Sequence, residues 1–261
     1  MSASERPRFW VLIPARRAST RLPDKPLADI GGAPMIVRVA QAAARSGASR
    51  IAVATDDTEI ASVVTDAGFD TVLTAAHHQS GTDRLAQACR ELGAPADQIV
   101  VNLQGDEPLM PPEVLSQIAA ALQKNAWASV STAVTPVQDL HEFHNPNAVK
   151  AVLASDGRAL YFSRAPIPYQ REAALSQPGP IPRYSTAHRH LGLYGFRAGL
   201  LSAFVAWGPS PLEQTEQLEQ LRWLEHGHAI CAVVLPTAPP AGVDTPEDLQ
   251  RVRAVWTGLA L

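Results

Sequence analysis

The chain has 261 residues, of which 46% are hydrophobic, and its 22 Lys and Arg against 25 Asp and Glu give a formal net charge of −3. This length and hydrophobic fraction exclude a disordered chain, because a chain of this size can bury a large apolar core. The near-neutral charge without a run of Lys or Arg excludes the basic face of a nucleic-acid or anionic-membrane binder.

The cysteines and the N-terminal residues bear on the compartment. Cys89 and Cys231 form no CxxC pair, so neither a zinc site nor a disulfide framework is predicted, and a reducing compartment fits best. The first residues are polar, and the apolar run 9–13 is too short for a signal segment or for a membrane span of roughly 20 residues. We therefore expect a cytoplasmic protein with no membrane or nucleic-acid partner.

The first half of the chain alternates strand and helix patterns. Residues 9–13 form a continuous apolar run, which is typical of a strand buried on both faces of a parallel sheet. Further strands are predicted at residues 51–54, 71–73 and 99–103. Helices are predicted over residues 34–47, 55–68 and about 82–92, and after Pro111 and Pro112. This alternation is typical of a doubly wound α/β fold.

Beyond Ser129 the pattern changes to short strand-like segments with long connections. These segments are residues 129–134, 149–153, 160–162 and 191–196, and the proline-rich residues 177–182 are expected to form a mobile surface loop. A polar helix over 211–227, a strand over 230–235 and a final helix capped by residues 245–248 follow. The predicted fold is a mostly parallel twisted sheet sandwiched by helices, with a small β excursion that can pair with a second subunit.

A basic loop follows the first predicted strand, where open α/β sheets bind ligands. Residues 14–26 carry four cations, which are Arg16, Arg17, Arg21 and Lys25. Guanidinium forks and an ammonium group can together neutralise a triphosphate. The loop matches neither GxxxxGK[ST] nor GxGxxG, and a solvated basic loop is the alternative interpretation.

Two acids follow later strands. Asp106 comes after the strand 99–103 and beside Gly105, and Asp244 comes after the last strand and beside Val243. Each acid could instead be a turn residue or a helix cap. As a pair opposite a basic loop, they predict a Mg²⁺ site that bridges phosphates.

Seven segments, arriving in chain order, are similar to motifs of the 3-deoxy-manno-octulosonate (Kdo) cytidylyltransferase family. They are residues 14–26, 78–84, 104–108, 145–150, 161–168, 190–197 and 242–249, and the similarity extends over about 9–253. The resemblance implies a Rossmann-like nucleotidyltransferase fold and a Mg²⁺-dependent reaction of CTP with Kdo that yields CMP-Kdo and pyrophosphate. It also implies a role in lipopolysaccharide biosynthesis and a cytoplasmic homodimer.

The resemblance further implies which residues form the site. Those expected to bind CTP are Ala15, Arg16, Arg21, Lys25, Gln79, Ser80, Gly81 and Arg84. Those expected to bind Kdo are Gln104, Arg164, His190, Tyr194, Glu219 and Gln220. The expected catalytic residues are Lys25, Arg16, Asp106 and Asp244, and the two acids are also the expected metal ligands. A single domain is predicted over 1–261, with its core at about 9–135 and 228–257 and a sugar-binding and dimerisation part at about 136–227.

Departures from the family pattern are few. Arg17 stands where an uncharged residue is expected, Ala33 replaces a polar residue, and residues 177–182 are unusually rich in proline. Two other functions stay open. One is a cytidylyltransferase for another keto sugar acid, such as 8-amino-Kdo or a sialic acid, and the other is a non-catalytic nucleotide-binding protein. The presence of both acids together with Lys25 favours an enzyme.

Overall fold

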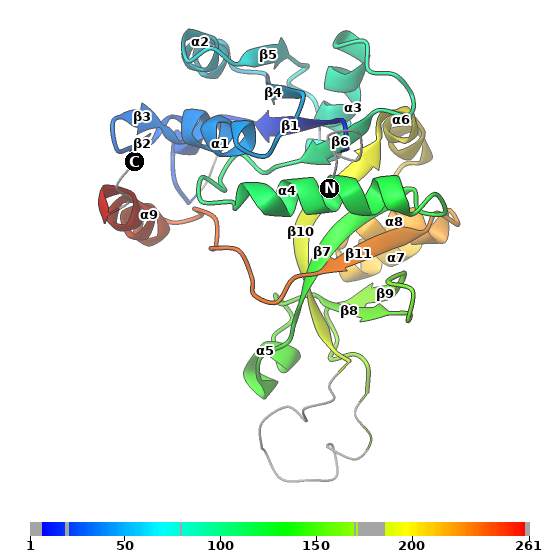
Figure 1. Cartoon of the computed structure of the whole chain (residues 1–261). Coiled ribbons are helices and arrows are strands. Elements are labelled where there is room, and N and C mark those ends of the chain that lie inside the picture. Colours follow the sequence, from blue (N-terminus) through cyan, green and yellow to red (C-terminus); the bar gives the residue numbers. More distant parts are fainter. Residues whose placement is uncertain (1–6, 19–20, 79, 170, 172–185, 259–261) are drawn as a thin grey trace. The chain divides into compact units, whose positions relative to one another are not determined.

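The computed structural model describes residues 7–18, 21–78, 80–169, 171 and 186–258, and Figure 1 shows the course of the chain. The chain divides into two compact units. The first unit comprises Met1–Ala120, Phe196–Val205 and Pro239–Leu261, and the second comprises Ala121–Gly195 and Ala206–Ala238. No helix among the described residues has the length and apolar character needed to cross a membrane.

The first unit contains a parallel sheet. Strand β1 (Phe9–Ala15) lies between β4 (Arg50–Thr55) and β6 (Ile99–Asn102), and β5 (Asp70–Leu73) pairs with β4. All three pairings are parallel, as predicted. The central strands are continuous apolar runs because helices cover both faces of such a sheet. All four residues of β6 are buried.

The helices of the first unit begin and end at signals that the sequence carries. They are α1 (Met35–Ala44), α2 (Thr58–Asp66), α3 (Gly81–Glu91), most of α4 (Pro112–Lys124), most of α6 (Ala198–Trp207) and α9 (Pro246–Gly258). The carboxylate of Asp57 accepts hydrogen bonds from the first turn of α2, and Ser80 and Asp83 form a capping box at α3. The short elements η2 (Lys25–Leu27), β2 (Asp29–Ile30) and β3 (Ala33–Pro34) precede α1, and the sequence patterns did not predict them.

The second unit contains the remaining strands. Strand β7 (Val130–Pro136) lies between β10 (His188–Arg197) and β11 (Ile230–Val234), and its pairing with β11 is parallel. Strand β8 (Lys150–Leu153) pairs antiparallel with β10 and with β9 (Ala159–Ser163). The predicted short strands are therefore confirmed, and the fold is the expected mixed α/β fold with a mostly parallel sheet flanked by helices. Helix α5 (Leu140–His144) was not predicted.

The polar helix that we predicted over 211–227 is interrupted. It consists of α7 (Pro211–Glu216) and α8 (Gln220–Glu225), and Gln217 between them has a left-handed backbone with φ 54°. The guanidinium of Arg164 donates to the carbonyl oxygens of Glu216, at 2.7 Å, and Gln217, at 3.3 Å. Those carbonyls would accept bonds within an unbroken helix, so Arg164 satisfies acceptors that the interruption releases. No Gly or Pro marks this position in the sequence. The proline-rich residues 177–182 lie outside the described part of the chain.

Candidate functional site

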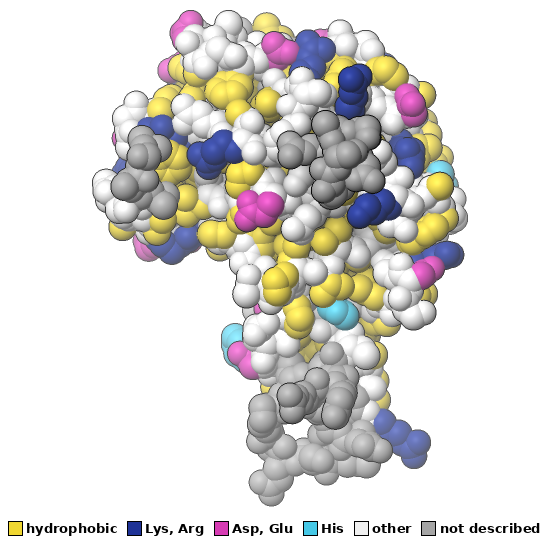
Figure 2. Space-filling model, viewed as in Figure 1, with side chains coloured by type: hydrophobic (Ala, Val, Ile, Leu, Met, Phe, Trp, Pro, Cys, Tyr) yellow, Lys and Arg dark blue, Asp and Glu magenta, His cyan; other side chains and the backbone are white. Residues whose placement is uncertain are grey.

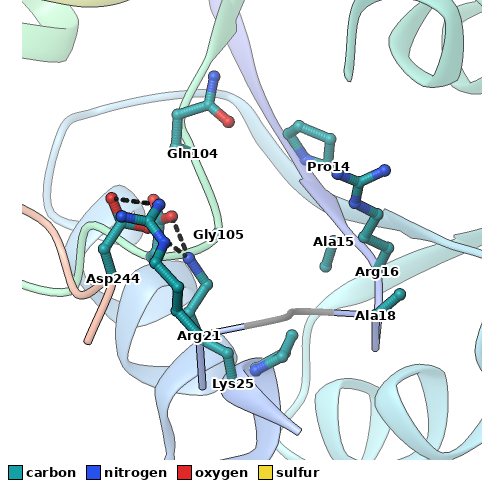
Figure 3. Close-up of a pocket in the computed structure, with 11 residues that line it drawn as sticks. Pro14, Ala15, Arg16, Ala18, Arg21, Lys25, Gln104, Gly105 and Asp244 are labelled. Carbon is teal, nitrogen blue, oxygen red and sulfur yellow. Dashed lines mark hydrogen bonds and ion pairs between the residues drawn. The ribbon is translucent and has the colours of Figure 1, made fainter. Parts of the chain in front are cut away.

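A hollow of about 380 Å³ opens in the first unit at the carboxyl ends of β1 and β6 (Figure 3). Its lining residues are Pro14, Ala15, Arg16, Ala18, Arg21, Lys25, Pro26, Gln104, Gly105, Asp106 and Asp244. Figure 3 shows Arg16 and Ala18 on the opposite side of the hollow from Asp244. The basic loop and both predicted acids therefore meet in one place, as expected for ligand binding beyond the carboxyl ends of parallel strands.

Lys25 lies between the two acids. Its Nζ atom is 2.6 Å from Oδ2 of Asp106 and 3.2 Å from Oδ1 of Asp244. Arg21 adds a second cation, with its NH2 atom 3.3 Å from Oδ2 of Asp244. The side chain of Lys25 is 16% exposed, whereas that of Arg21 is 66% exposed. The lysine contact is therefore much less screened by solvent than the arginine contact.

Two glycines allow the chain segments of the hollow to approach each other. A Cβ atom on Gly105 would lie 3.0 Å from the backbone oxygen of Pro14, and one on Gly242 would lie 3.0 Å from that of Asp106. The backbone nitrogen of Val243 also donates to the Asp106 oxygen at 2.8 Å. This close backbone contact places Asp244 beside Asp106, although the two residues are far apart in the sequence.

The alternative interpretation of Asp244 as a helix cap is not what the structure shows. The cap of α9 is formed by Thr245 and Asp248, because the backbone nitrogen of Asp248 donates to the Thr245 hydroxyl at 3.2 Å. In return, the backbone nitrogen and hydroxyl of Thr245 donate to the Asp248 carboxylate, each at 3.1 Å. The carboxylate of Asp244 is directed instead to the two cations of the hollow.

The two carboxylates of the hollow suit a hard divalent cation whose other ligands come from substrate phosphates and water. Asp106 and Asp244 converge on one ammonium group, so their carboxylates are close enough to share a cation. Within the described residues, no group of three or more His, Cys, Asp or Glu could hold a metal. Two carboxylates without further protein ligands are typical of Mg²⁺ bound together with substrate phosphates and water.

A second hollow of about 170 Å³ adjoins the first. Residues lining it are Pro14, Ala15, Arg16, His78, Ser80, Gly81, Arg84 and Gln104, and four of these also line the first hollow. Arg16 is one of the shared residues, so a single elongated ligand can contact it from both sides. The predicted CTP-binding residues are therefore brought together, apart from Gln79, which lies outside the described residues.

Arg84 is buried behind this second hollow. Its guanidinium donates to the Thr74 hydroxyl and lies 3.3 Å from the carboxylate of Asp56, and the side chain is 5% exposed. Asp56 offsets the charge of Arg84, so the guanidinium is engaged mainly by protein groups and contributes little charge to a ligand. We interpret it as a residue that supports the wall of the hollow.

Arg17 points away from the hollow. Its Nε atom is 2.6 Å from the carboxylate of Asp24, and its NH1 atom is 2.6 Å from that of Glu59 near the start of α2. The unexpected cation thus connects the basic loop to a neighbouring helix. Sequence reasoning missed this role because nothing near Arg17 in the chain identifies Glu59 as its partner.

Glu107 is a further acid whose role the sequence did not indicate. Its Oε2 atom is buried and has no hydrogen-bond partner among the described residues. Burial, and then the neighbouring charge of Asp106, raise its pKa to about 8. The group is therefore largely protonated at neutral pH, beside the two acids that remain available for a cation.

Three of the predicted sugar-binding residues meet in the second unit. The hydroxyl of Tyr194 donates to Oε1 of Gln220 at 3.1 Å, and Nε2 of Gln220 lies 3.5 Å from Nδ1 of His190. Burial lowers the pKa of His190 to about 3, so the ring is neutral. Burial, and then the charge of Glu219, hold the pKa of Tyr194 well above its usual value.

Arg164 lies in the same unit and is fixed by backbone groups. Besides the two carbonyls at the helix interruption, its NH1 atom donates to the oxygen of Pro146 at 2.9 Å. Glu216 accepts from the backbone nitrogen of Arg164 at 2.9 Å and from the Ser163 hydroxyl at 2.5 Å. Glu219 also lies in this unit, at the start of α8, whereas Gln104 belongs to the first unit.

Lys150 was not among the predicted site residues, although it ends one of the motif segments. Its side chain is fully buried, its Nζ atom donates to the oxygen of Asn145 at 2.7 Å, and burial lowers its pKa. This bond ties the start of β8 to the turn beside Pro146, which in turn accepts from Arg164.

Charged side chains are mixed in sign on the surface. Figure 2 shows Lys and Arg interspersed with Asp and Glu on the face that it presents, without a continuous basic area. This view agrees with the low net charge and gives no sign of a phosphate-backbone track on that face.

Comparisons with known proteins identify the family. A family model described as cytidylyltransferase matches residues 10–230. The chain is 36% identical to a solved CMP:2-keto-3-deoxy-manno-octonic acid synthetase complexed with CTP, over 96% of this chain and 99% of that one, with a TM-score of 0.86. A cytidylyltransferase from Leptospira borgpetersenii serovar Hardjo-bovis (strain JB197) is 15% identical over 97% of this chain and 88% of its own, with a TM-score of 0.61, and supports the fold alone. The motif resemblance is thus confirmed, and the chain belongs to the cytidylyltransferase family.

Proposed function

We propose that this protein activates Kdo by reaction with CTP, giving CMP-Kdo and pyrophosphate. The observation that carries the proposal is the position of Lys25 between the carboxylates of Asp106 and Asp244, at the carboxyl end of a parallel sheet. That arrangement supplies a cation for a transferring phosphate and two carboxylates for a metal. The 36% identity to a Kdo-activating synthetase over nearly the whole chain supports the choice of substrate pair.

The two adjoining hollows suit CTP. The triphosphate would lie along the first hollow, where Arg16, Arg21 and Lys25 provide positive charge. The nucleoside would lie in the second, where Ser80 and Gly81 begin α3 and the partial positive charge of that helix end faces the ligand. Arg16 lines both hollows and would contact the nucleotide where they meet.

The reaction needs no covalent intermediate on the protein. The anomeric hydroxyl oxygen of Kdo forms a bond to the α-phosphorus, the bond from that phosphorus to the bridging oxygen breaks, and pyrophosphate leaves with the bonding electrons. The hydroxyl proton passes to solvent or to a neighbouring carboxylate. Lys25 acts on the charge that grows on the phosphate oxygens, because its ammonium is already positioned and poorly exposed.

Asp106 and Asp244 would hold Mg²⁺, which would supply positive charge against the phosphate oxygens. Both carboxylates are engaged by Lys25 in the present structure. A cation held there would share these two carboxylates with the Lys25 ammonium group. Glu107 is largely protonated at neutral pH, so it adds little repulsion toward a triphosphate.

Residues of the second unit would bind the sugar acid, and Arg164 is the natural partner of its carboxylate. A guanidinium carries five N–H donors, and in the described structure three of those of Arg164 go to backbone carbonyls. One donor on each terminal nitrogen is left, which is the fork that a carboxylate accepts in two hydrogen bonds. Tyr194, Glu219 and Gln220 would bind sugar hydroxyls.

The setting of the enzyme is also part of the proposal. A CMP-activated Kdo would serve lipopolysaccharide biosynthesis, and CTP as a substrate fits a cytoplasmic location. Both cysteines are buried free thiols, which fits a reducing compartment. The strands β8 and β9 form the excursion that would serve a homodimer.

The test is pyrophosphate release by the purified protein with CTP and Mg²⁺, and with Kdo, 8-amino-Kdo or a sialic acid in parallel reactions. Release with Kdo, abolished by EDTA and by omission of CTP, supports the proposal. Release with another sugar acid alone would move the assignment to that substrate. No release with any of the three would overturn the assignment to sugar activation.

A further inference from the structure

Thr132 lies in β7 of the second unit and contacts the side chain of a predicted sugar-binding residue. It is fully buried in β7, and its hydroxyl oxygen is 2.9 Å from Nε2 of His190. The same hydroxyl donates to the backbone oxygen of Leu193 at 2.8 Å, with the oxygen of Leu191 at 3.3 Å. Neither the motif resemblance nor the strand pattern singled out this residue.

The chemistry of these partners determines the direction of the bond to the histidine. A hydroxyl has one proton, and a backbone carbonyl can only accept. The proton of Thr132 therefore goes to the carbonyl of Leu193, and the oxygen of Thr132 must accept from the ring. His190 is neutral, so it carries one ring proton, and that proton belongs on Nε2.

The surroundings of the ring keep it in this state. Phe162 packs edge-on against His190 at a centroid distance of 4.8 Å, and the ring of Tyr194 is tilted against His190 at a centroid distance of 5.4 Å. Phe162 is fully buried. An imidazolium ion would lose its hydration among these rings, so the choice for His190 lies between two neutral tautomers.

The assigned tautomer of His190 also determines the hydrogen-bond directions of the neighbouring side chains. With its proton on Nε2, His190 presents Nδ1 as an acceptor, and the amide nitrogen of Gln220 faces it at 3.5 Å. The amide oxygen of Gln220 then faces Tyr194 and accepts from its hydroxyl at 3.1 Å. Each bond in the series has one permitted direction once the first is set.

We infer that Thr132 is a positioning residue of the sugar-acid site, which holds His190 as the Nε2–H tautomer and thereby orients the amide of Gln220 and the hydroxyl of Tyr194. Thr132 acts through these side chains and is not itself expected to touch the sugar. The inference rests on the proposed function, because the oriented groups are those assigned to the sugar hydroxyls.

The oriented groups would present a fixed pattern of donors and acceptors. If the Gln220 amide were turned over, its NH₂ group would take the place of its oxygen. A sugar hydroxyl that donates to that oxygen would lose its acceptor, and the resulting unpaired polar groups would oppose binding. Thr132 would thus affect which polyhydroxylated keto acid is accepted, while leaving the nucleotide side of the reaction unaffected.

The kinetic test compares three variants. Thr132→Val removes the hydroxyl at nearly constant shape, Thr132→Ser restores it, and Thr135→Val makes the same exchange at another buried threonine of β7. With Thr132→Val we expect kcat/KM for Kdo to fall roughly tenfold and KM for CTP to stay within about twofold, since about one neutral hydrogen bond is lost. Thr132→Ser and Thr135→Val should stay close to wild type.

The second readout needs no sugar. Protein labelled with ¹⁵N-histidine should show a protonated Nε2 and an unprotonated Nδ1 for His190, with its signals assigned by their loss in His190→Gln. Thr132→Val should shift the ring toward the Nδ1–H tautomer, and Thr132→Ser should not. A wild-type Nδ1–H ring would overturn the inference, as would a Thr132→Val protein with unchanged tautomer and unchanged constants for Kdo.

The two readouts separate the two proposals. If the wild-type protein transfers no cytidylyl group to any sugar acid, the proposed function fails. An Nε2–H ring that depends on the Thr132 hydroxyl would still support the control of His190 in that case. If Thr132→Val does not fold, the wild-type tautomer and the constants of Thr132→Ser decide.

Discussion

Replacement of Lys25 by methionine tests the central contact of the proposed active site. The change removes the ammonium while keeping much of the length and apolar character of the side chain. The lost group lies 2.6 Å from Asp106 and 3.2 Å from Asp244, and the lysine side chain is 16% exposed. We expect kcat to fall about 100- to 1000-fold, which is the effect of removing one positioned donor from a developing oxyanion.

Arg21 provides the matched control, because it contributes an equal charge to the same hollow. Its only ion pair in the described structure is with Asp244 at 3.3 Å, and its side chain is 66% exposed. A contact so open to solvent contributes about 0.2–1 kcal/mol, so Arg21→Met should lower activity less than about fivefold. The difference in kcat loss between Lys25→Met and Arg21→Met measures how much burial increases the effect of one positive charge.

The assay is initial pyrophosphate release at saturating CTP, Mg²⁺ and Kdo, with melting temperatures measured on the same preparations. Lys25→Met should lose kcat while keeping a cooperative melting transition. Equal losses of kcat in the two variants would refute the reasoning, since the effect would then follow net charge and not the position of Lys25. Increasing salt should reduce the Arg21 effect further and leave the Lys25 effect nearly unchanged.

Three further outcomes are expected. Asp106→Asn should raise the Mg²⁺ concentration needed for half-maximal rate more than about tenfold, measured by Mg²⁺ titration, because one of two charged ligands is lost; an unchanged midpoint would remove Asp106 from the metal site. Arg17→Met should raise KM for CTP by less than about fivefold, because its ion pairs with Asp24 and Glu59 are exposed; a larger loss would indicate direct phosphate contact. Glu107, with a native pKa of about 8 against 4.5 unfolded, keeps a proton that the unfolded chain releases, so its burial makes stability fall between about pH 5 and 8. In wild type the free energy of unfolding should fall by up to about 1.4 kcal/mol per pH unit across that range, and urea unfolding of Glu107→Gln should lack this slope. An unaltered slope in the variant would contradict the assignment.

Several features of this protein are determined by the sequence alone. Strands β1, β4 and β6 each contain a continuous apolar run, and this local pattern is sufficient to predict a parallel sheet covered on both faces. Asp106 could be singled out because it directly follows such a run, where ligands bind in folds of this type. The order of the motif segments also predicted the family that the comparisons then identified.

The interruption between α7 and α8 was beyond local prediction. The segment has the polar, charged composition of a continuous helix, and Gln217 is not a residue that marks a break. The break is tolerated because Arg164, more than 50 positions earlier in the chain, donates hydrogen bonds to the released carbonyls. Arg84 is a similar case, since its burial depends on Asp56, which no sequence spacing connects to it.

Sequence by itself thus determined the main strands and helices of the first unit, where the acids and cations follow the strands, and which family motifs are present, because these depend on neighbouring residues and on composition. Tertiary structure alone decided that Lys25 lies between two acids 81 and 219 positions away, and that Thr132 faces His190. A threonine in a strand has the same sequence signature whether its hydroxyl is structural or directs a site. The direction of its hydrogen bond depends on which carbonyls and ring nitrogens the folded chain brings within about 3 Å of it.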